Sequence, residues 1–64
     1  MDADTKTKLI TRYRRYEAEQ QARIDMATRV LALYPHQRTA QHILADATAR
    51  RDVYANILKI VEGE

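Results

Sequence analysis

The stretch Tyr34-Pro35-His36 lies near the middle of the 64-residue chain and contains its only proline. The only glycine is Gly63, next to the end, so neither flanking arm contains a helix-breaking residue. A proline disfavours helical backbone angles in the residue before it, and a helix therefore tends to end there. The sequence predicts one all-α domain over residues 1–64, with helices at about 4–33 and 36–62 joined by a turn at Pro35.

The expected helix ends carry residues that suit them. Asp4 and Thr5 can each accept hydrogen bonds from free backbone N–H groups at the start of the first helix. The second helix begins either with Pro35 in its first turn or slightly later, with Thr39 as its cap. Gly63 is suited to follow its last turn.

Two arrangements of the arms are open: a single long helix kinked at Pro35, and an antiparallel two-helix hairpin. A kinked rod leaves its apolar side uncovered, whereas a hairpin covers both arms. Apolar residues recur at helical spacing on each arm. In a hairpin that turns at Pro35, the numbers of facing residues add to about 70, so that Leu9 faces Val61 and Tyr16 faces Tyr54. This match favours the hairpin.

One polar layer interrupts the expected seam between the helices. Gln20 lies in the middle of the first apolar stripe, and Arg50 lies opposite it. In one interpretation Arg50 runs along the seam and carries its charge out to water. In the other, a polar network of Glu17, Gln20 and Arg50 sets the alignment of the helices at some cost in stability.

The apolar residues exceed what one seam requires. Extra apolar surface on a small chain is typical of an interface. Two hairpins packed into a four-helix bundle, as a homodimer, would cover it, and so would a different protein. The predicted protein-interface residues are Met26, Leu33, Val53, Ile57, Ile60 and Val61.

Basic residues concentrate near the N-terminus. Residues 6–15 contain five bases and no acid, although the whole chain has a net charge of only +2. Lys8, Arg12, Arg15 and Arg23 recur at helical spacing on one side of the first helix, away from its apolar stripe. This side is interpreted as a site for a nucleic acid, as a site for an acidic protein, or as a solvated basic face.

The residues that usually carry catalysis are scarce. The chain has no cysteine and no serine, and His36 and His42 lie six residues apart, on different sides of a helix. We therefore expect no enzyme activity, no cofactor and no metal. No apolar stretch approaches the roughly 20 residues of a membrane span, and the N-terminus lacks a signal-peptide pattern, so we expect a cytoplasmic protein with no membrane contact.

The sequence thus favours a small, non-enzymatic, helical protein–protein interaction module: a regulator, inhibitor or adaptor that acts through an apolar helix surface. One alternative is a dimeric nucleic-acid-binding hairpin that uses the basic side of the first helix. A second alternative is a structural element whose whole function is self-assembly.

Overall fold

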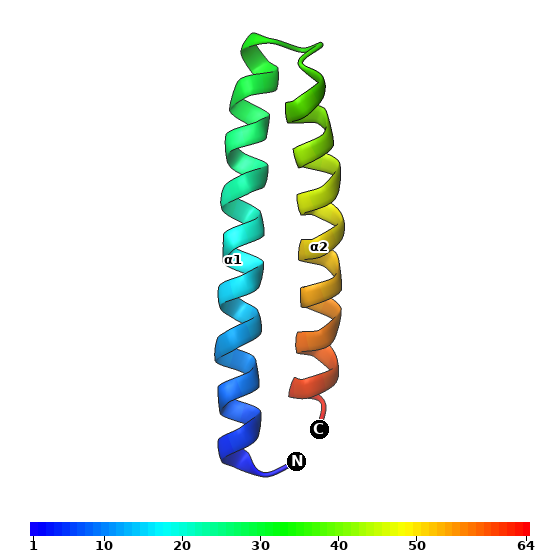
Figure 1. Ribbon diagram of the computed structural model, residues 1–64. Helices are drawn as coiled ribbons and strands as arrows, with labels where there is room; N and C mark the ends of the chain where they lie inside the picture. Colours follow the sequence, from blue (N-terminus) through cyan, green and yellow to red (C-terminus); the bar gives the residue numbers. More distant parts are fainter.

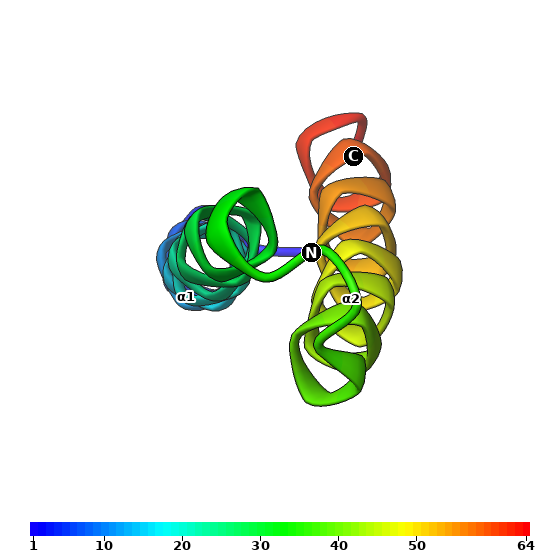
Figure 2. The same ribbon diagram turned by 90° about the horizontal axis from the view of Figure 1, so that it is seen from above.

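The computed structural model describes all 64 residues and contains two helices, α1 (Ala3–Leu33) and α2 (Arg38–Glu62). The helices run antiparallel, side by side, with both termini at the end of the rod opposite the turn (Figure 1). Viewed from above, α2 is inclined relative to α1 (Figure 2). The Cα atoms span 47 × 13 × 13 Å. The prediction of an all-α antiparallel hairpin is confirmed, and the kinked single helix is wrong.

The first helix begins one residue earlier than predicted, and its cap is neither Asp4 nor Thr5. Asp2 caps α1, because its carboxylate accepts a hydrogen bond from the backbone N–H of Thr5 at 2.7 Å. This hydrogen bond holds the pKa of the Asp2 carboxyl below its usual range. Asp4 lies in the first turn, where a negative charge is favourable beside the helix dipole.

The second helix begins two residues later than predicted, and Pro35 lies outside it. Gln37 is the cap: its side-chain oxygen accepts a hydrogen bond from the backbone N–H of Ala40 at 2.6 Å. Gln41 donates a second bond back to the Pro35 carbonyl at 2.9 Å. Thr39 is therefore the second residue of the helix and not its cap. As predicted, α2 ends immediately before Gly63.

Small side chains dominate the turn half of the seam, and larger ones the other half. Its buried apolar residues are Ala27, Ala40, Ala47, Leu58 and Val61, and no large side chain is completely buried. The buried and half-buried positions of α2 follow alternating steps of three and four residues, the spacing of helices that pack along their whole length.

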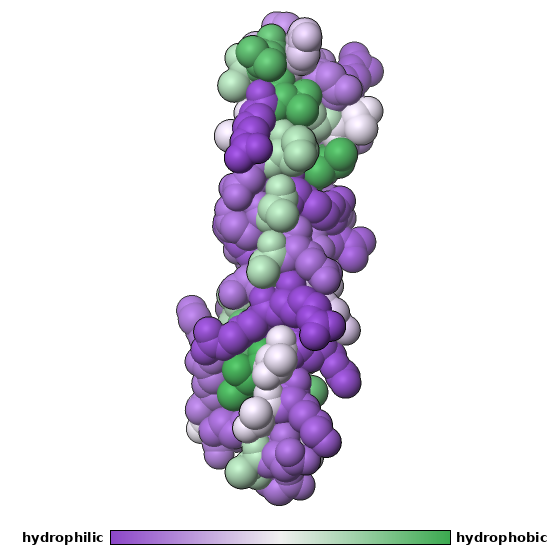
Figure 3. All heavy atoms as spheres, turned by 90° about the vertical axis from the view of Figure 1, so that its left-hand side faces the viewer, coloured by the Kyte–Doolittle hydropathy of each residue, from purple (hydrophilic) through white to green (hydrophobic).

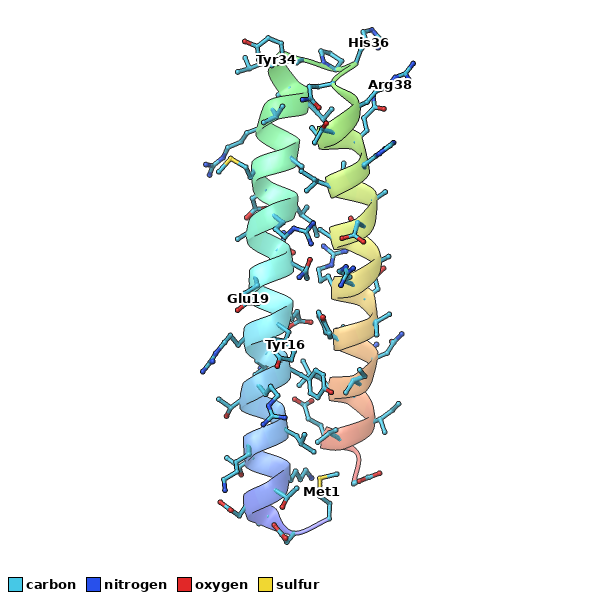
Figure 4. All side chains as sticks on the ribbon, in the orientation of Figure 1. Met1, Tyr16, Glu19, Tyr34, His36 and Arg38 are labelled. Atoms are coloured by element: carbon cyan, nitrogen blue, oxygen red, sulfur yellow. The ribbon has the colours of Figure 1, made fainter.

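The predicted register of the hairpin is confirmed where tyrosines pair across it. Tyr16 points toward α2 (Figure 4), and its ring centroid lies 5.4 Å from that of Tyr54. Tyr13 packs edge-on against Tyr16 and tilts against Tyr54. These three rings fill the seam near the open end of the rod, where the alanines of the turn end give way to larger residues.

Candidate interaction surface

A central polar cluster interrupts the seam, formed by Gln20, Arg23, Asp46 and Arg50. Gln20 is only 9% exposed. The Arg23 guanidinium donates hydrogen bonds to the Gln20 side-chain oxygen at 2.7 Å and, across the seam, to the Asp46 carboxylate at 3.2 Å. The cluster therefore satisfies its buried amide oxygen and links α1 to α2.

Asp46 lies between two arginines in this cluster. Arg50 donates from Nε to both carboxylate oxygens of Asp46, at 2.9 and 3.1 Å. These hydrogen bonds hold the pKa of Asp46 below its usual range and raise the pKa of Arg50 above its own. Asp46 is thus kept ionised by partners on both helices.

The predicted network of Glu17, Gln20 and Arg50 is not the one that forms. Arg50 bonds to Asp46, four residues earlier on the same helix, because residues at that spacing are neighbours on a helix surface. The Arg50 side chain is more than half exposed, which agrees with the first interpretation, in which Arg50 extends along the seam and its charge reaches water. Glu17 takes no part, and Gln20 receives its hydrogen bond from Arg23 instead.

Arg23 was expected on the basic side of α1 and lies at the seam instead. The reason is spacing: the steps of three and four residues through Tyr13, Tyr16 and Gln20 lead next to Arg23. A prediction of the seam from the spacing of apolar residues alone does not include Arg23. The same rule misses Arg51, which is half-buried on α2 and donates to the Gln21 side chain of α1 at 3.1 Å.

Large apolar side chains are exposed at both ends of the rod. The exposed fraction is 60% for Met26 and 75% for Leu33 on α1, and 54% for Val53 and 65% for Ile60 on α2. Ile57 is half-buried. Val61, also predicted as an interface residue, is buried at 7% exposure. Val61 packs in the seam between α1 and α2, as expected from its predicted position opposite Leu9, and is not available to a partner.

The exposed apolar residues of the two helices lie on one face of the hairpin. Met26 and Val30 line a shallow groove that also contains Arg23. Val53 lines a neighbouring groove with Asp46. Because Arg23 and Asp46 form an ion pair, both grooves open on the same side of the molecule.

Helical spacing extends this surface along both helices. Leu33 lies two turns beyond Met26, and Ile57 and Ile60 lie one and two turns beyond Val53, so each stays on the same side of its helix. Figure 3 views the outer side of α1: hydrophobic atoms gather near the turn end and again in the lower half of the rod, with hydrophilic atoms between them. We call this surface the apolar face; its residues are Met26, Val30, Leu33, Val53, Ile57 and Ile60.

The opposite side of the hairpin is crossed by polar contacts. Arg14 and Glu62 form an ion pair at 2.7 Å between the helices, and Lys6 donates to the Glu62 carbonyl at 3.3 Å. Arg51 joins Gln21 on the same side. Charged contacts therefore join the helices on both sides of the hairpin, and Met26, Val30 and Val53 lie beside the Arg23–Asp46 pair.

The remaining basic residues predicted as a site do come together. Lys8, Arg12 and Arg15 line one shallow groove with Thr7, Thr11 and Tyr16. Lys8 pairs with Asp4 at 3.1 Å in a largely exposed contact that contributes little to stability. Arg12 and Arg15 make no ion pair or hydrogen bond within the chain, in contrast to Arg14, Arg23, Arg50 and Arg51. We call this the basic groove.

Neither histidine joins a site. His36, in the turn, and His42, on α2, are both exposed. No three His, Asp or Glu side chains come close enough together to hold a metal ion. Neither helix has an apolar stretch long enough to cross a membrane.

Comparison of the chain with protein-family models, curated proteins and solved structures finds no match. Any conclusion about function therefore depends on the surfaces described above.

Proposed function

We propose that this chain is a non-enzymatic helical interaction module that acts through its apolar face. The observation that carries the proposal is the exposure of Met26, Leu33, Val53 and Ile60, each more than half accessible on one side of a small rod. Scattered exposed apolar residues are ordinary, but a set that shares one face of two adjacent helices is typical of an interaction site.

We further propose that a second copy of the hairpin covers this face, giving a homodimeric four-helix bundle. The accessible surface of the chain is 4853 Å², whereas a folded monomer of its mass exposes about 4,250 Å². The excess, about 600 Å², approaches the roughly 800 Å² that one partner buries in a stable interface. A 64-residue chain whose core consists largely of alanines also gains more from such burial than a larger domain does.

Light scattering coupled to size-exclusion chromatography tests this proposal. We expect a mass of twice 7.5 kDa at micromolar concentration. The double variant Val53→Asn, Ile60→Asn should shift the chain to monomer, because it removes two side chains from the apolar face. The matched control, Ala45→Asn, changes an exposed residue on the other side of α2 and should leave the dimer intact. A wild-type chain that stays monomeric would exclude the dimer and leave a different protein as the partner of this face.

The basic groove favours a second candidate function, the binding of nucleic acid. Its Arg12 and Arg15 guanidinium groups have no partner in the chain, and arginine binds phosphate in two-pronged geometry. Tyr16 packs against two other rings in the seam, so the groove offers contacts to phosphates and not a stacking platform for bases. Glu19 points away from α2 one turn further along and reduces the positive charge there (Figure 4).

Fluorescence anisotropy with a labelled 20-nucleotide RNA separates this candidate from the first. If the groove binds phosphates, affinity falls steeply with salt concentration, and changing Lys8, Arg12 and Arg15 to Gln abolishes it. The matched control removes the same charge elsewhere by changing Arg29, Arg38 and Lys59 to Gln. Equal loss in both triple variants, or no binding by the unmodified chain, would exclude a nucleic-acid site in this groove.

A further inference from the structure

We infer that the proposed dimer is built on α2, which packs antiparallel against α2 of the second copy through one continuous row of side chains. This inference rests on the proposed function, since it specifies how that dimer is arranged. Its evidence is a second row of residues on α2, beside the seam, that hairpin formation leaves exposed or half-buried. We call this row the α2 stripe; its residues are Thr39, Ile43, Asp46, Arg50, Val53, Ile57 and Ile60.

The α2 stripe has the spacing of a coiled-coil contact. Its residues follow one another in alternating steps of four and three, so they form a single row along the helix. Each of them immediately precedes a buried or half-buried residue of the seam, and a step of one residue turns about 100° around a helix. The stripe therefore points out of the side of the hairpin and slightly away from α1. Its first five members line the two grooves beside the Arg23–Asp46 ion pair.

The α2 stripe is complementary to its own reverse. A two-fold axis between the copies, perpendicular to the rod and at the height of residue 48, turns the second hairpin end for end and lays its α2 antiparallel on the first. Facing residues on the two α2 helices then have numbers that add to about 96. Ile43 meets Val53 of the second copy, and Thr39 meets Ile57. Because the contact is isologous, each pair forms twice.

The charged residues of the stripe specify the register of this contact. At its centre, Asp46 of each copy lies beside Arg50 of the other, so that every charge meets one of opposite sign. A shift by one heptad in either direction would place Asp46 beside Ile57 or Ile43, with a charge against an apolar side chain. A charged layer within an otherwise apolar row therefore favours one alignment over its neighbours.

The same rotation stacks α1 on α1 of the second copy. Since the α2 stripe points away from α1, this second contact is the wider of the two. It places Met26, Val30 and Leu33 over the half of the other α1 that contains the basic groove. The alkyl stems of Arg12 and Arg15 can cover these apolar side chains while their guanidinium groups stay in water. The close contact of the dimer is therefore the one between the two α2 helices.

An arrangement with both turns at the same end is less favourable. A two-fold axis parallel to the rod keeps every residue at its own height, so Val53 and Ile57 would lie over Arg15 and Arg12 of the other copy. It would also gather the two basic grooves at one end of the bundle, where like charges repel. End-for-end packing places the basic grooves at opposite ends of the bundle and gives Val53 an apolar partner in Ile43.

Disulfide cross-linking tests the arrangement in a background that contains no native cysteine. The chains Ile43→Cys and Val53→Cys are mixed, equilibrated and oxidised, and the products are identified by mass. Antiparallel packing of the α2 stripe predicts a disulfide between the two different chains. It predicts none in either chain alone, because two copies of the same position would lie about 15 Å apart along the helices, beyond the roughly 7 Å that a disulfide can span.

A second matched pair and a mismatched pair complete the experiment. Thr39→Cys mixed with Ile57→Cys should also cross-link, and Thr39 is an exposed residue outside the seam. Ile43→Cys mixed with Ile60→Cys should not, because these positions are displaced by seven residues, or about 10 Å. Circular dichroism of each reduced variant shows whether it folds. Since none of these positions belongs to the buried core, we expect unchanged helix content.

The outcomes separate this inference from the function that it assumes. A dimer in which Val53→Cys links to itself, or in which a matched pair fails to link although both of its chains fold, overturns the antiparallel contact of α2 and leaves the dimer standing. Linking of the mismatched pair as readily as the matched pairs overturns the register. A chain that is monomeric by light scattering overturns the dimer and the arrangement together.

Discussion

The guanidinium of Arg23 on α1 lies 3.2 Å from the carboxylate of Asp46 on α2, forming an ion pair across the middle of the hairpin. The same guanidinium satisfies the buried oxygen of Gln20. Arg23 lies beside Met26 on α1, and Asp46 lies beside Val53 on α2. Because Arg23 and Asp46 are in contact, the exposed apolar residues of both helices lie on one surface. The polar cluster in the middle of the seam therefore helps to determine the position of the proposed interface.

Replacement of Gln20 by Leu tests what the central polar cluster contributes to stability. We expect the variant to be more stable by about 1 kcal/mol, because a buried amide becomes an apolar side chain of similar size, while Arg23 keeps Asp46 and water as partners. For a chain of this length the midpoint of thermal unfolding should rise by about 4–8 °C. Removal of the donor instead, in Arg23→Leu, should lower the midpoint, since it leaves the Gln20 oxygen buried without its partner. A loss of stability in Gln20→Leu would mean that the hydrogen bond itself holds the seam together.

Acid should destabilise the hairpin partly through Asp46. Hydrogen bonds from Arg50 lower the pKa of Asp46 in the folded chain below its ordinary value of 3.8. A carboxyl whose pKa is lower in the folded state stabilises that state above the unfolded pKa, and this contribution is lost as the pH falls through the folded pKa. Urea unfolding measured between pH 2 and 7 should therefore show stability decreasing below about pH 4.

Asp46→Asn removes this group from the titration. The variant should be less stable at pH 7 and should lose less of its remaining stability on acidification. Asp25→Asn is the control, because that exposed carboxylate bonds only to Gln21 of its own helix. If both variants respond to acid as the unmodified chain does, Asp46 is not a source of the acid sensitivity.

Several of these features could be predicted from the sequence, and the failures have physical causes. Pro35 as the only internal breaker, together with the match of apolar residues across the two arms, predicted the hairpin and its register. The caps were misplaced because Asp2 and Asp4 are equally good acceptors two residues apart, and because Gln37 is not a common capping residue. Arg50 and Arg51 are adjacent in sequence but about 100° apart around the helix, so a small rotation decides which of them lies in the seam. The ion pair of Arg23 at the edge of the seam depends on a carboxylate from the other helix, which the pattern of one helix does not contain.

Gln37→Ala tests the cap of the second helix. The side-chain oxygen of Gln37 accepts the backbone N–H of buried Ala40, and its loss should cost about 1 kcal/mol. Thermal unfolding followed by circular dichroism should show a decrease of about 4–8 °C in the midpoint. Gln37→Glu keeps an acceptor oxygen at the same place and should stay close to the unmodified chain. Equal destabilisation of both variants would show that the amide group, and not its acceptor, is what the turn requires.

Ala47→Leu tests whether the helices approach as closely as the structure places them. Ala47 has no exposed surface, so a larger side chain must push α1 and α2 apart or take up a strained rotamer. Overpacking of this kind costs about 1–3 kcal/mol, which denaturant unfolding resolves readily. Ala45→Leu makes the same chemical change at an exposed position two residues earlier and should alter stability by less than about 0.5 kcal/mol. A chain that accepts Leu at position 47 as easily as at position 45 would contradict the close contact of the helices at Ala47.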